Sequence, residues 1–267
     1  IIVAPGIYTG VGFAVVDLEG RSIILRSSDG AATTVIDGEN ARRCLRINTG
    51  ENESTQIIGF TLTNGDSDDG GGASCLDSSP QFSHCIFESN SANFGGGIHC
   101  SNSNPTLTNC TFTNNIATLD GGGICNNESI ATLENCTFTS NVANTGGGMY
   151  GNTNSDSTLI GCIFTDNTAS LEGGGMCNVG GSDPTLTDCT FTGNTASQGG
   201  GMANQVSSPS LTGCAFTGNT ANGDGGGMYN NNSSNPTITD CTFTSNFATT
   251  GGGMYGNTDS DSTLTGC

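Results

Sequence analysis

A repeat of about 26 residues, recurring from residue 82 to the end of the chain, limits the possible folds more than any other feature. Its core reads Thr-Leu-Thr-x-Cys-Thr-Phe-Thr-x-Asn-x-Ala, followed by Gly-Gly-Gly and an apolar residue. Phenylalanines spaced 25 to 27 residues apart mark its successive copies: Phe87, Phe112, Phe138, Phe164, Phe191, Phe216 and Phe243. A fixed period of this length predicts a solenoid, in which each repeat forms one turn and buries its apolar face against its neighbours.

Residues 106–131 show how one turn is expected to fold. Residues 106–108 and 110–113 alternate threonine with an apolar residue or cysteine, which is typical of short strands that bury every second side chain. A third strand is expected after the glycine triplet. Three short strands per turn, with no amphipathic helix, predict an all-β fold: a parallel β-helix solenoid with about 26 residues per turn. We expect a right-handed coil, because parallel crossovers are overwhelmingly right-handed.

Two further features recur at fixed offsets in the repeat. An asparagine follows each phenylalanine, and stacked asparagine side chains can form an amide ladder along a parallel sheet. The predicted ladder contains Asn90, Asn115, Asn141, Asn167, Asn194, Asn219 and Asn246. The glycine triplets are predicted to be corners of the coil, because glycine permits positive φ and close backbone approach. The triplets begin at Gly70, Gly95, Gly121, Gly146, Gly173, Gly199, Gly225 and Gly251.

Eight of the thirteen cysteines share one position, two residues before the position of the phenylalanine. They are Cys85, Cys110, Cys136, Cys162, Cys189, Cys214, Cys241 and Cys267. This spacing favours a buried column of thiols that behave as small apolar groups. Disulfides between neighbouring turns are an alternative in an oxidising compartment, since stacked Cα atoms would be about 4.8 Å apart. The sequence contains no Cys-x-x-Cys pair, which argues against a zinc site.

The chain divides into two regions of one continuous solenoid. Residues 1–64 contain short β-rich runs broken by Gly, Asp and Ser, which predict irregular N-terminal turns. Residues 65–267 form the regular repeat array. The chain begins without Met and stops in the middle of a repeat, so we expect a trimmed piece of a longer protein.

Charge is unevenly distributed along the chain. The formal net charge is −19, all five basic residues are arginines within residues 1–46, and residues 47–267 hold nineteen acids with no Lys or Arg. Such a surface repels phosphate backbones and anionic headgroups, which argues against nucleic-acid and membrane-surface binding. No apolar run is long enough to span a bilayer, so we expect no membrane insertion by this segment.

Three motifs carry a family resemblance: Val-Ala-Pro-Gly-Ile-Tyr at 3–8, Gly-Phe-Thr-Leu-Thr-Asn-Gly at 59–65, and the Cys-x-Phe-x-x-Asn and Gly-Gly-Gly-Ile/Met repeats. With these, the chain resembles the right-handed parallel β-helix repeat proteins of bacteria. The repeats are also similar to those of the chlamydial polymorphic outer-membrane protein passengers. The resemblance implies a secreted or surface-displayed protein, often an adhesin or structural surface component. Some relatives with this fold are polysaccharide lyases, hydrolases or epimerases.

The leading hypothesis is a non-catalytic rod, located extracellularly or at the cell surface, with a structural or adhesive role. Its regular repeat leaves no special turn for an active site, so we assign no catalytic and no cofactor-binding residue. The expected partners are surface glycans or other copies of the chain, stacked end to end into fibres through open sheet edges.

The alternative is a polysaccharide-active enzyme of the pectate-lyase-like fold. Lyase chemistry needs a base and a cation that neutralises the uronate, and the absence of Arg and Lys beyond residue 46 removes the usual groups. Asp66, Asp68 and Asp69 form the densest acidic cluster. They are candidates for a Ca²⁺ site or for half of a hydrolase carboxylate pair.

A third hypothesis concerns the outward threonines of the second strand. They form Thr-x-Thr pairs that would lie on one face and bind ice or glycans, or carry O-glycans: Thr111, Thr113, Thr137, Thr139, Thr190, Thr192, Thr242 and Thr244. The array resembles the flat threonine faces of insect β-helical antifreeze proteins. Ile163 and Ala215 interrupt it. Threonine is also simply a good residue for an exposed strand, so this alternative stays open.

Overall fold

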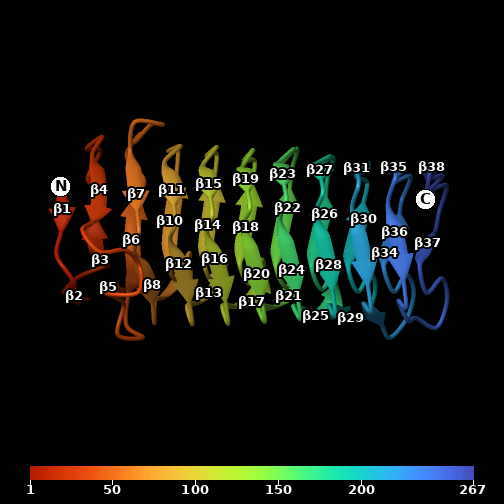
Figure 1. Ribbon diagram of the computed structural model, residues 1–267, viewed down its shortest axis with the longest axis horizontal. Coiled ribbons are helices and arrows are strands. Elements are labelled where there is room, and N and C mark those ends of the chain that lie inside the picture. The colour runs from red at the N-terminus through yellow and green to blue at the C-terminus, as the bar shows by residue number, and fades with distance from the viewer.

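The computed structural model describes all residues, 1–267, as a rod of parallel β-strands without a helix. Each turn lays its strands against the equivalent strands of the neighbouring turns, so like strands form continuous sheets along the rod (Figure 1). Equivalent residues of successive repeats lie opposite each other on neighbouring strands; Phe112, for example, pairs with Phe138. The predicted all-β parallel solenoid is therefore confirmed.

Three sheets run the full length of the rod, and we call them A, B and C. Sheet A contains β1 (Ile2–Val3), β4 (Ile24–Ser27), β7 (Gln56–Ile58), β11 (Gln81–Ser83), β15 (Thr106–Thr108), β19 (Thr132–Glu134), β23 (Thr158–Ile160), β27 (Thr185–Thr187), β31 (Ser210–Thr212), β35 (Thr237–Thr239) and β38 (Thr263–Thr265). Sheet B contains β2 (Gly6–Tyr8), β5 (Thr34–Asp37), β8 (Thr61–Thr63), β12 (Ile86–Glu88), β16 (Thr111–Thr113), β20 (Thr137–Thr139), β24 (Ile163–Thr165), β28 (Thr190–Thr192), β32 (Ala215–Thr217) and β36 (Thr242–Thr244). Sheet C contains β3 (Ala14–Asp17), β6 (Arg43–Ile47), β10 (Ala73–Leu76), β14 (Ile98–Ser101), β18 (Ile124–Asn127), β22 (Met149–Asn152), β26 (Met176–Val179), β30 (Met202–Gln205), β34 (Met228–Asn231) and β37 (Met254–Gly256).

A fourth, shorter sheet was not expected from the sequence, and we call it sheet D. It contains β9 (Asp66–Asp69), β13 (Ser91–Phe94), β17 (Ile116–Asp120), β21 (Val142–Thr145), β25 (Thr168–Glu172), β29 (Thr195–Ala196) and β33 (Thr220–Ala221). These strands occupy the stretch between the asparagine and the glycine triplet, where the sequence predicts only a corner with an inward alanine. The alanines are indeed buried, as Ala117 is. Each middle turn thus adds a fourth strand to the three predicted ones.

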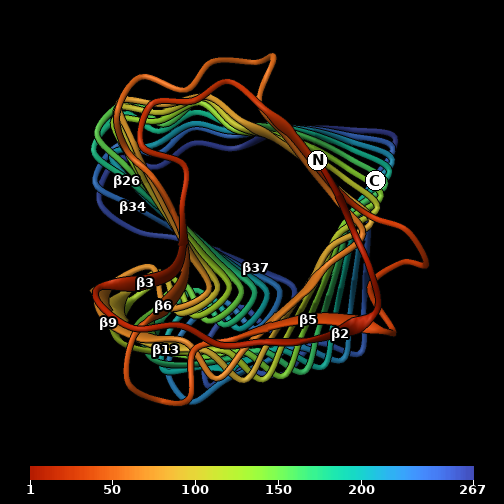
Figure 2. The same cartoon turned by 90° about the vertical axis from the view of Figure 1, so that its left-hand side faces the viewer.

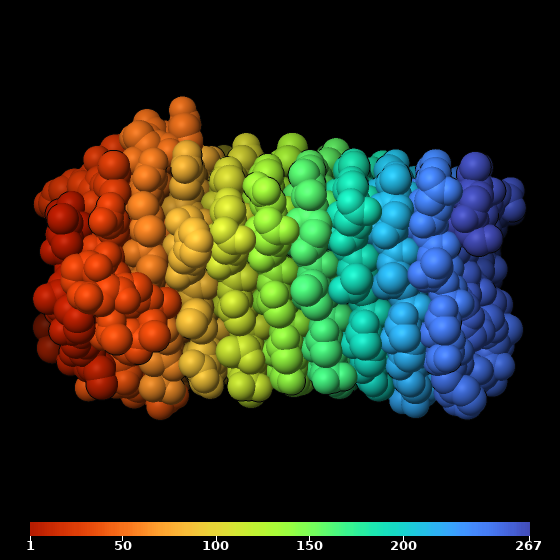
Figure 3. Space-filling view, viewed as in Figure 1, coloured from red at the N-terminus to blue at the C-terminus, as the bar shows by residue number.

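The chain visits the sheets in the order A, B, D, C and then returns to A in the next turn. Seen end-on, the turns superimpose as one coil around a central space (Figure 2). The buried core side chains fill this space. The eleven strands of sheet A, stepped by about 4.8 Å, give a rod about 48 Å long. The space-filling view shows the same succession of turns as parallel bands across the rod (Figure 3).

The corners between sheets depend on residues that tolerate a left-handed backbone. In the turn that starts at β15, the corner residues are Asn109, Asn114 and Gly121, with φ of 53°, 54° and 69°. Asn tolerates this region through local hydrogen bonding of its short side chain. The second glycine of the triplet is needed for a different reason: a Cβ on Gly122 would lie 2.4 Å from the carbonyl oxygen of Gly147 in the next turn. The glycine triplet therefore allows the backbones of successive turns to approach more closely than they could if these residues carried a Cβ.

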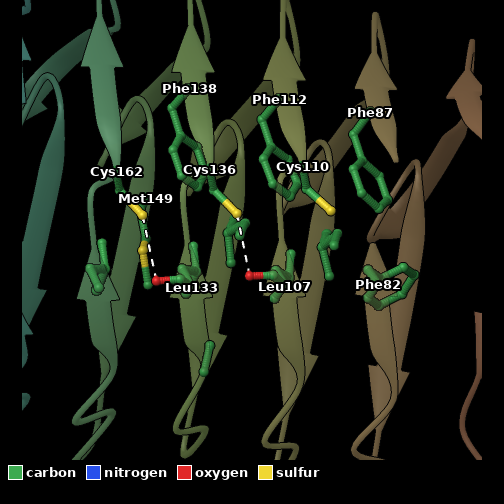
Figure 4. Packing of buried hydrophobic residues seen from close by; sticks show 14 of the residues in the cluster. Phe82, Phe87, Leu107, Cys110, Phe112, Leu133, Cys136, Phe138, Met149 and Cys162 are labelled. Carbon is green, nitrogen blue, oxygen red and sulfur yellow. Dashed lines mark hydrogen bonds between the residues drawn. The ribbon is translucent and has the colours of Figure 1, made fainter. Parts of the chain in front are cut away.

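The core is a set of ladders made of identical side chains. The phenylalanine rings from Phe87 to Phe243 stack with centroids 4.6 to 4.8 Å apart and planes within 2° to 5° of parallel. The cysteine column runs beside them, and each thiol donates to backbone carbonyl oxygens: the Cys136 thiol lies 3.5 Å from the Leu107 oxygen (Figure 4). Apolar burial in continuous columns supplies the main driving force for such a coil.

The predicted asparagine ladder is confirmed, and its hydrogen bonds are complete. In Asn141, Oδ1 accepts from both the backbone N and Nδ2 of Asn115, at 3.1 and 3.0 Å. Its Nδ2 donates to the Phe112 carbonyl oxygen at 3.0 Å and to Asn167 Oδ1 at 2.9 Å. Because the residue is fully buried, these four bonds satisfy groups that would otherwise lose water without compensation.

A serine ladder, which the sequence analysis missed, lines the corner between sheets C and A. In every member except Ser182, the backbone N donates to the hydroxyl of the serine one turn later, and Ser103 donates to Ser129 in this way at 3.0 Å. The buried members are Ser78, Ser103, Ser129, Ser155, Ser182, Ser207 and Ser234. Their regular spacing in the sequence was the available signal.

Candidate functional site: two threonine faces and a groove

The threonines named as a candidate face lie on the outside of sheet B, on either side of the buried phenylalanines. Strand alternation places them there, because the phenylalanine between them points inward. The first column is interrupted where β24 has Ile163 and β32 has Ala215. The second column is unbroken over six turns: Thr113, Thr139, Thr165, Thr192, Thr217 and Thr244. Thr165 and Thr217 were missed because their partners in the first column are not threonine.

Sheet A carries a second threonine face that the sequence analysis did not name. Its strands alternate Thr-Leu-Thr in the same way, with the leucine buried and the threonines outside, as in β15 and β27. The two faces meet at the corner that contains Asn109. A periodic array of hydroxyls about 4.8 Å apart along the rod therefore covers two adjacent sides of the molecule.

The three aspartates named as a candidate Ca²⁺ or hydrolase site do not converge on one point. Asp66, Asp68 and Asp69 belong to strand β9, whose side chains alternate in exposure instead of converging from a loop. Arg43 lies close enough to influence both Asp68 and Asp69, and Asn93 Nδ2 donates to Asp68 Oδ1 at 3.3 Å. No group of three or more His, Cys, Asp or Glu side chains in the chain is placed to hold a metal ion. Strand alternation places Asp66 and Asp68 on one face of β9 and Asp69 on the other, so the three carboxylates are not aimed at a common point.

A groove lies between the outer face of sheet C and the residues that precede the glycine triplets. A cavity of about 350 Å³ is lined by Asp69, His99, Asp120 and Tyr150 among others. A second cavity of about 660 Å³ shares Tyr150 and continues along the rod past Glu172. The two cavities meet at Tyr150, which lines both, and together we call them the groove.

The floor of this groove is one outward column of sheet C. In register, it consists of Ser74, His99, Cys125, Tyr150, Cys177, Ala203, Tyr229 and Tyr255. The opposite edge consists of the residues that precede the glycine triplets. They are Asp69, Phe94, Asp120, Thr145, Glu172, Gln198, Asp224 and Thr250. Every second turn thus places a carboxylate on the groove edge, a pattern absent from the sequence analysis although its 51- to 52-residue spacing was visible.

Burial shifts the pKa values of the titratable side chains that line the groove. It raises the pKa of Asp120 and of Glu172, while hydrogen bonds from Thr145 and Gln205, respectively, act in the opposite direction. Burial lowers the pKa of His99; Asp69 opposes this shift and Arg43 adds to it, so the ring is neutral at pH 7. Burial also raises the pKa of the Cys125 and Cys177 thiols, which stay protonated.

The groove spaces its carboxylates widely. Asp120 and Glu172 lie two turns apart, which corresponds to about 9.6 Å along the rod. Carboxylate pairs of inverting glycosidases are about 6.5–9.5 Å apart and those of retaining enzymes about 5–5.5 Å. The rod spacing of these residues is therefore much wider than a retaining pair and lies at the upper end of the range for an inverting pair.

The cysteines are all free thiols. Twelve of the thirteen are buried and Cys267 is exposed. The alternative of disulfides between neighbouring turns is therefore not what the structure contains. No helix of the structure is long and apolar enough to cross a membrane.

Stacked parallel strands, joined by left-handed corners and filled with like-residue ladders, define the class of the protein as a parallel β-helix. The chain matches the family model described as a right handed beta helix region over residues 43–194 and again over 97–267, and it belongs to that family. The coil is right-handed, as predicted. Comparison with curated proteins gives no match, and comparison with solved structures gives none either.

Proposed function

We propose that the protein is a non-catalytic rod that works outside the cell as a structural or adhesive component. One observation carries this proposal: the same side chains recur at the same register in turn after turn, on the surface as well as in the core. An active site needs a particular set of groups at one place. The groove along sheet C repeats its carboxylates two turns apart instead of gathering them.

The threonine faces support an adhesive role. Hydroxyl groups about 4.8 Å apart on two flat, adjacent sides offer many equivalent weak contacts to a surface rich in hydroxyls, such as a glycan coat. Many weak contacts on one rigid body combine into strong attachment through effective concentration. Self-association through sheet edges at the rod ends, which would extend rods into fibres, belongs to the same proposal.

Adhesion is tested by retention of the protein on glycan-coated surfaces. Thr113, Thr139 and Thr165 on sheet B would be replaced together by Glu, and the matched control replaces Ile116, Val142 and Thr168, an exposed column of sheet D outside both threonine faces, in the same way. Binding through the candidate face predicts loss of retention for the sheet B variant alone. Full retention of the sheet B variant would remove this face from the proposal.

A second candidate function, a polysaccharide-active enzyme, is favoured by one observation. Asp120 and Glu172 are half-buried in a groove, and burial raises the pKa of both, as general acids require. Product release would be measured on neutral, uronate-containing and amino-sugar polysaccharides, comparing the wild type with the Asp120→Asn/Glu172→Gln variant. The non-catalytic proposal predicts no release by either protein. Release by the wild type that falls by about 100-fold or more in the variant would establish the enzyme instead.

A further inference from the structure

We infer that the groove along sheet C is a docking site for a basic peptide in the polyproline II conformation, supplied by a partner protein. This inference does not depend on whether the rod is catalytic. It follows from the charge of the groove, from the spacing of that charge, and from the aromatic side chains on the floor.

The groove edge is anionic and its carboxylates have no cationic partner. The ion pairs of the protein are Arg21–Glu19, Arg42–Glu39 and Arg46–Asp17, all within residues 1–46. Asp120, Glu172 and Asp224 have no Lys or Arg anywhere in the array to neutralise them. A cationic ligand that replaces water there gains charge-assisted hydrogen bonds, which are the stronger kind.

The spacing of these carboxylates selects the conformation of the ligand. Alternate turns lie about 9.6 Å apart along the rod. A polyproline II helix repeats every three residues with a rise of about 3.1 Å per residue, or about 9.3 Å per repeat. Basic residues at every third position therefore follow Asp120, Glu172 and Asp224 with a mismatch of about 0.6 Å over four turns. A β-strand repeats its facing side chains at about 6.7 Å, which does not match.

The floor of the groove suits the rest of such a peptide. Tyr150 lies where the two cavities join, and Tyr229 and Tyr255 stack with ring centroids 6.0 Å apart further along the same column. Tyr150 and Tyr255 are partly exposed, so their rings are open to contact. Proline-rich segments dock into aromatic-lined grooves because their conformation is already extended and little entropy is lost on binding.

The groove also has a direction. At its N-terminal end, a cavity of about 460 Å³ is lined by Arg43, Arg46, Asp68 and Asp69, so the carboxylates there already have guanidinium groups beside them. A basic ligand therefore gains more from the turns from Asp120 onward, where no Lys or Arg competes for the carboxylates. The charge distribution therefore sets where on the rod the peptide lies.

The test uses fluorescein-labelled peptides and fluorescence anisotropy at physiological salt. The probe is a peptide of four Lys-Pro-Pro repeats, and the control peptide has the same composition with lysines at irregular spacings. We expect the repeat peptide to bind at least tenfold more tightly than the irregular one. Equal affinity would overturn the inference, because general polyelectrolyte attraction does not depend on spacing.

Two variants of equal charge locate the binding. Asp120→Asn/Glu172→Gln changes the groove, and Asp156→Asn/Asp183→Asn changes two exposed carboxylates at the corner between sheets C and A. The inference predicts at least a tenfold loss of affinity for the first variant and less than a twofold loss for the second. Equal losses would overturn it. A chitosan oligosaccharide that displaces the peptide from the groove, and binds more tightly than it does, would assign the groove to amino sugars and also overturn it.

The affinity must also fall in acid. Burial raises the pKa of Asp120 and Glu172, so both lose their charge at a higher pH than exposed carboxyls do. Binding of the repeat peptide should weaken as the pH falls through those raised pKa values, while its lysines stay charged. A pH-independent affinity between pH 7 and 4 would contradict the role of these carboxylates.

Discussion

In residues 65–267 the phenylalanine, cysteine and asparagine positions of the interior hold the same side chain in turn after turn, whereas the turns of residues 1–64 fill the interior with different side chains. The array stacks phenylalanine on phenylalanine. The irregular turns instead pack a mixed apolar core that includes Leu25, Ile36 and Leu45. They also contain every ion pair of the protein. The two regions form one continuous coil, but the array is stabilised by ladders of like side chains and the irregular turns by a mixed apolar core and ion pairs.

The difference is explained by how the ladders end. The serine ladder ends at Glu51, whose buried carboxylate accepts from the Ser78 hydroxyl at 3.0 Å and from the backbone N of Gly20 and Thr49 at 2.9 and 2.8 Å. The phenylalanine stack ends where Phe82 meets Phe87 edge-on at 73°. A ladder supplies its own partners everywhere except at its first rung, so the irregular turns must supply different groups there.

The asparagine ladder ends in the same region. Asn90 Nδ2 donates to the Leu62 carbonyl oxygen at 3.0 Å, and Asn90 Oδ1 accepts from the backbone N of Gly65 at 2.8 Å. The Cys44 thiol donates to the same oxygen at 3.7 Å. Residues of the irregular turns therefore supply the hydrogen-bond partners that the first residue of each ladder lacks, and we call them terminators of the array. They differ from one another because each ladder needs a different partner.

The largest effect is expected from the glycine triplets, which only the array contains. Gly122→Ala places a Cβ 2.4 Å from a backbone oxygen of the next turn, which neither turn can avoid. We expect a loss of more than about 4 kcal/mol of unfolding free energy, measured by urea denaturation. Gly218→Ala is the control, since its Cβ meets nothing within 4 Å and only the φ of +64° is strained, at about 1–2 kcal/mol. Similar losses for both would mean that close backbone approach does not set the packing.

The next largest effect is expected inside the asparagine ladder. Asn141→Ala removes the acceptor of two Asn115 donors and the amide that donates to the Phe112 carbonyl oxygen, all in a dry core. We expect a loss of about 3 kcal/mol or more in the same assay, because each unpaired buried group costs about 1–3 kcal/mol. Asn93→Ala, whose amide is exposed, should cost about 0.5 kcal/mol or less. A small decrease in the unfolding free energy of Asn141→Ala would show that the asparagine ladder does not stabilise the array.

A smaller effect is expected at the terminator of the serine ladder. Glu51→Gln replaces one carboxylate oxygen by an amide NH₂, which cannot accept the hydrogen bonds that Gly20, Thr49 and Ser78 donate to this carboxylate. We expect the free energy of unfolding to fall by about 2 kcal/mol at pH 7. Burial raises the pKa of Glu51, but hydrogen bonds from Thr49, Gly20 and Ser78 outweigh it and lower the pKa overall. Its contribution is therefore complete above the unfolded-state pKa and is lost as the pH falls through the lower folded-state pKa.

The measurement for Glu51 is the unfolding free energy of wild type and variant between pH 7 and 2. The two curves should approach each other as the pH falls through the folded-state pKa. Glu53→Gln, at an exposed carboxylate of the same loop, is the control and should leave the curve unchanged. A gap between wild type and Glu51→Gln that persists at pH 2 would refute the assignment of the carboxylate as the terminator.

The smallest effect concerns local opening of the two regions. Turns near the end of a solenoid open at a lower free energy than central ones. Cys44 lies on β6, beyond which sheet C has only β3, whereas Cys136 lies in the middle of the array. We expect Cys44 to react with a thiol reagent at least tenfold faster than Cys136, with mass-spectrometric peptide mapping as the readout. Equal rates for Cys44 and Cys136 would mean that the array and the irregular turns open together.

The sequence predicted those parts of the fold that recur in every turn. Phenylalanine, cysteine, asparagine and glycine keep a constant offset, so their columns could be assigned before any coordinates. Sheet D was missed because its strands vary in length and composition, from five residues in β17 to two in β29. The groove was missed because its carboxylates appear only in alternate turns, and the role of Glu51 because its donors lie as many as 31 residues away in irregular segments.

The most direct test of the proposed extracellular rod is immuno-electron microscopy of the source cells, together with negative-stain imaging of the purified protein. The proposal predicts label outside the cell envelope and straight rods or fibres built from units about 48 Å long. Label confined to the cell interior would contradict the proposal, as would compact particles that are not rod-shaped.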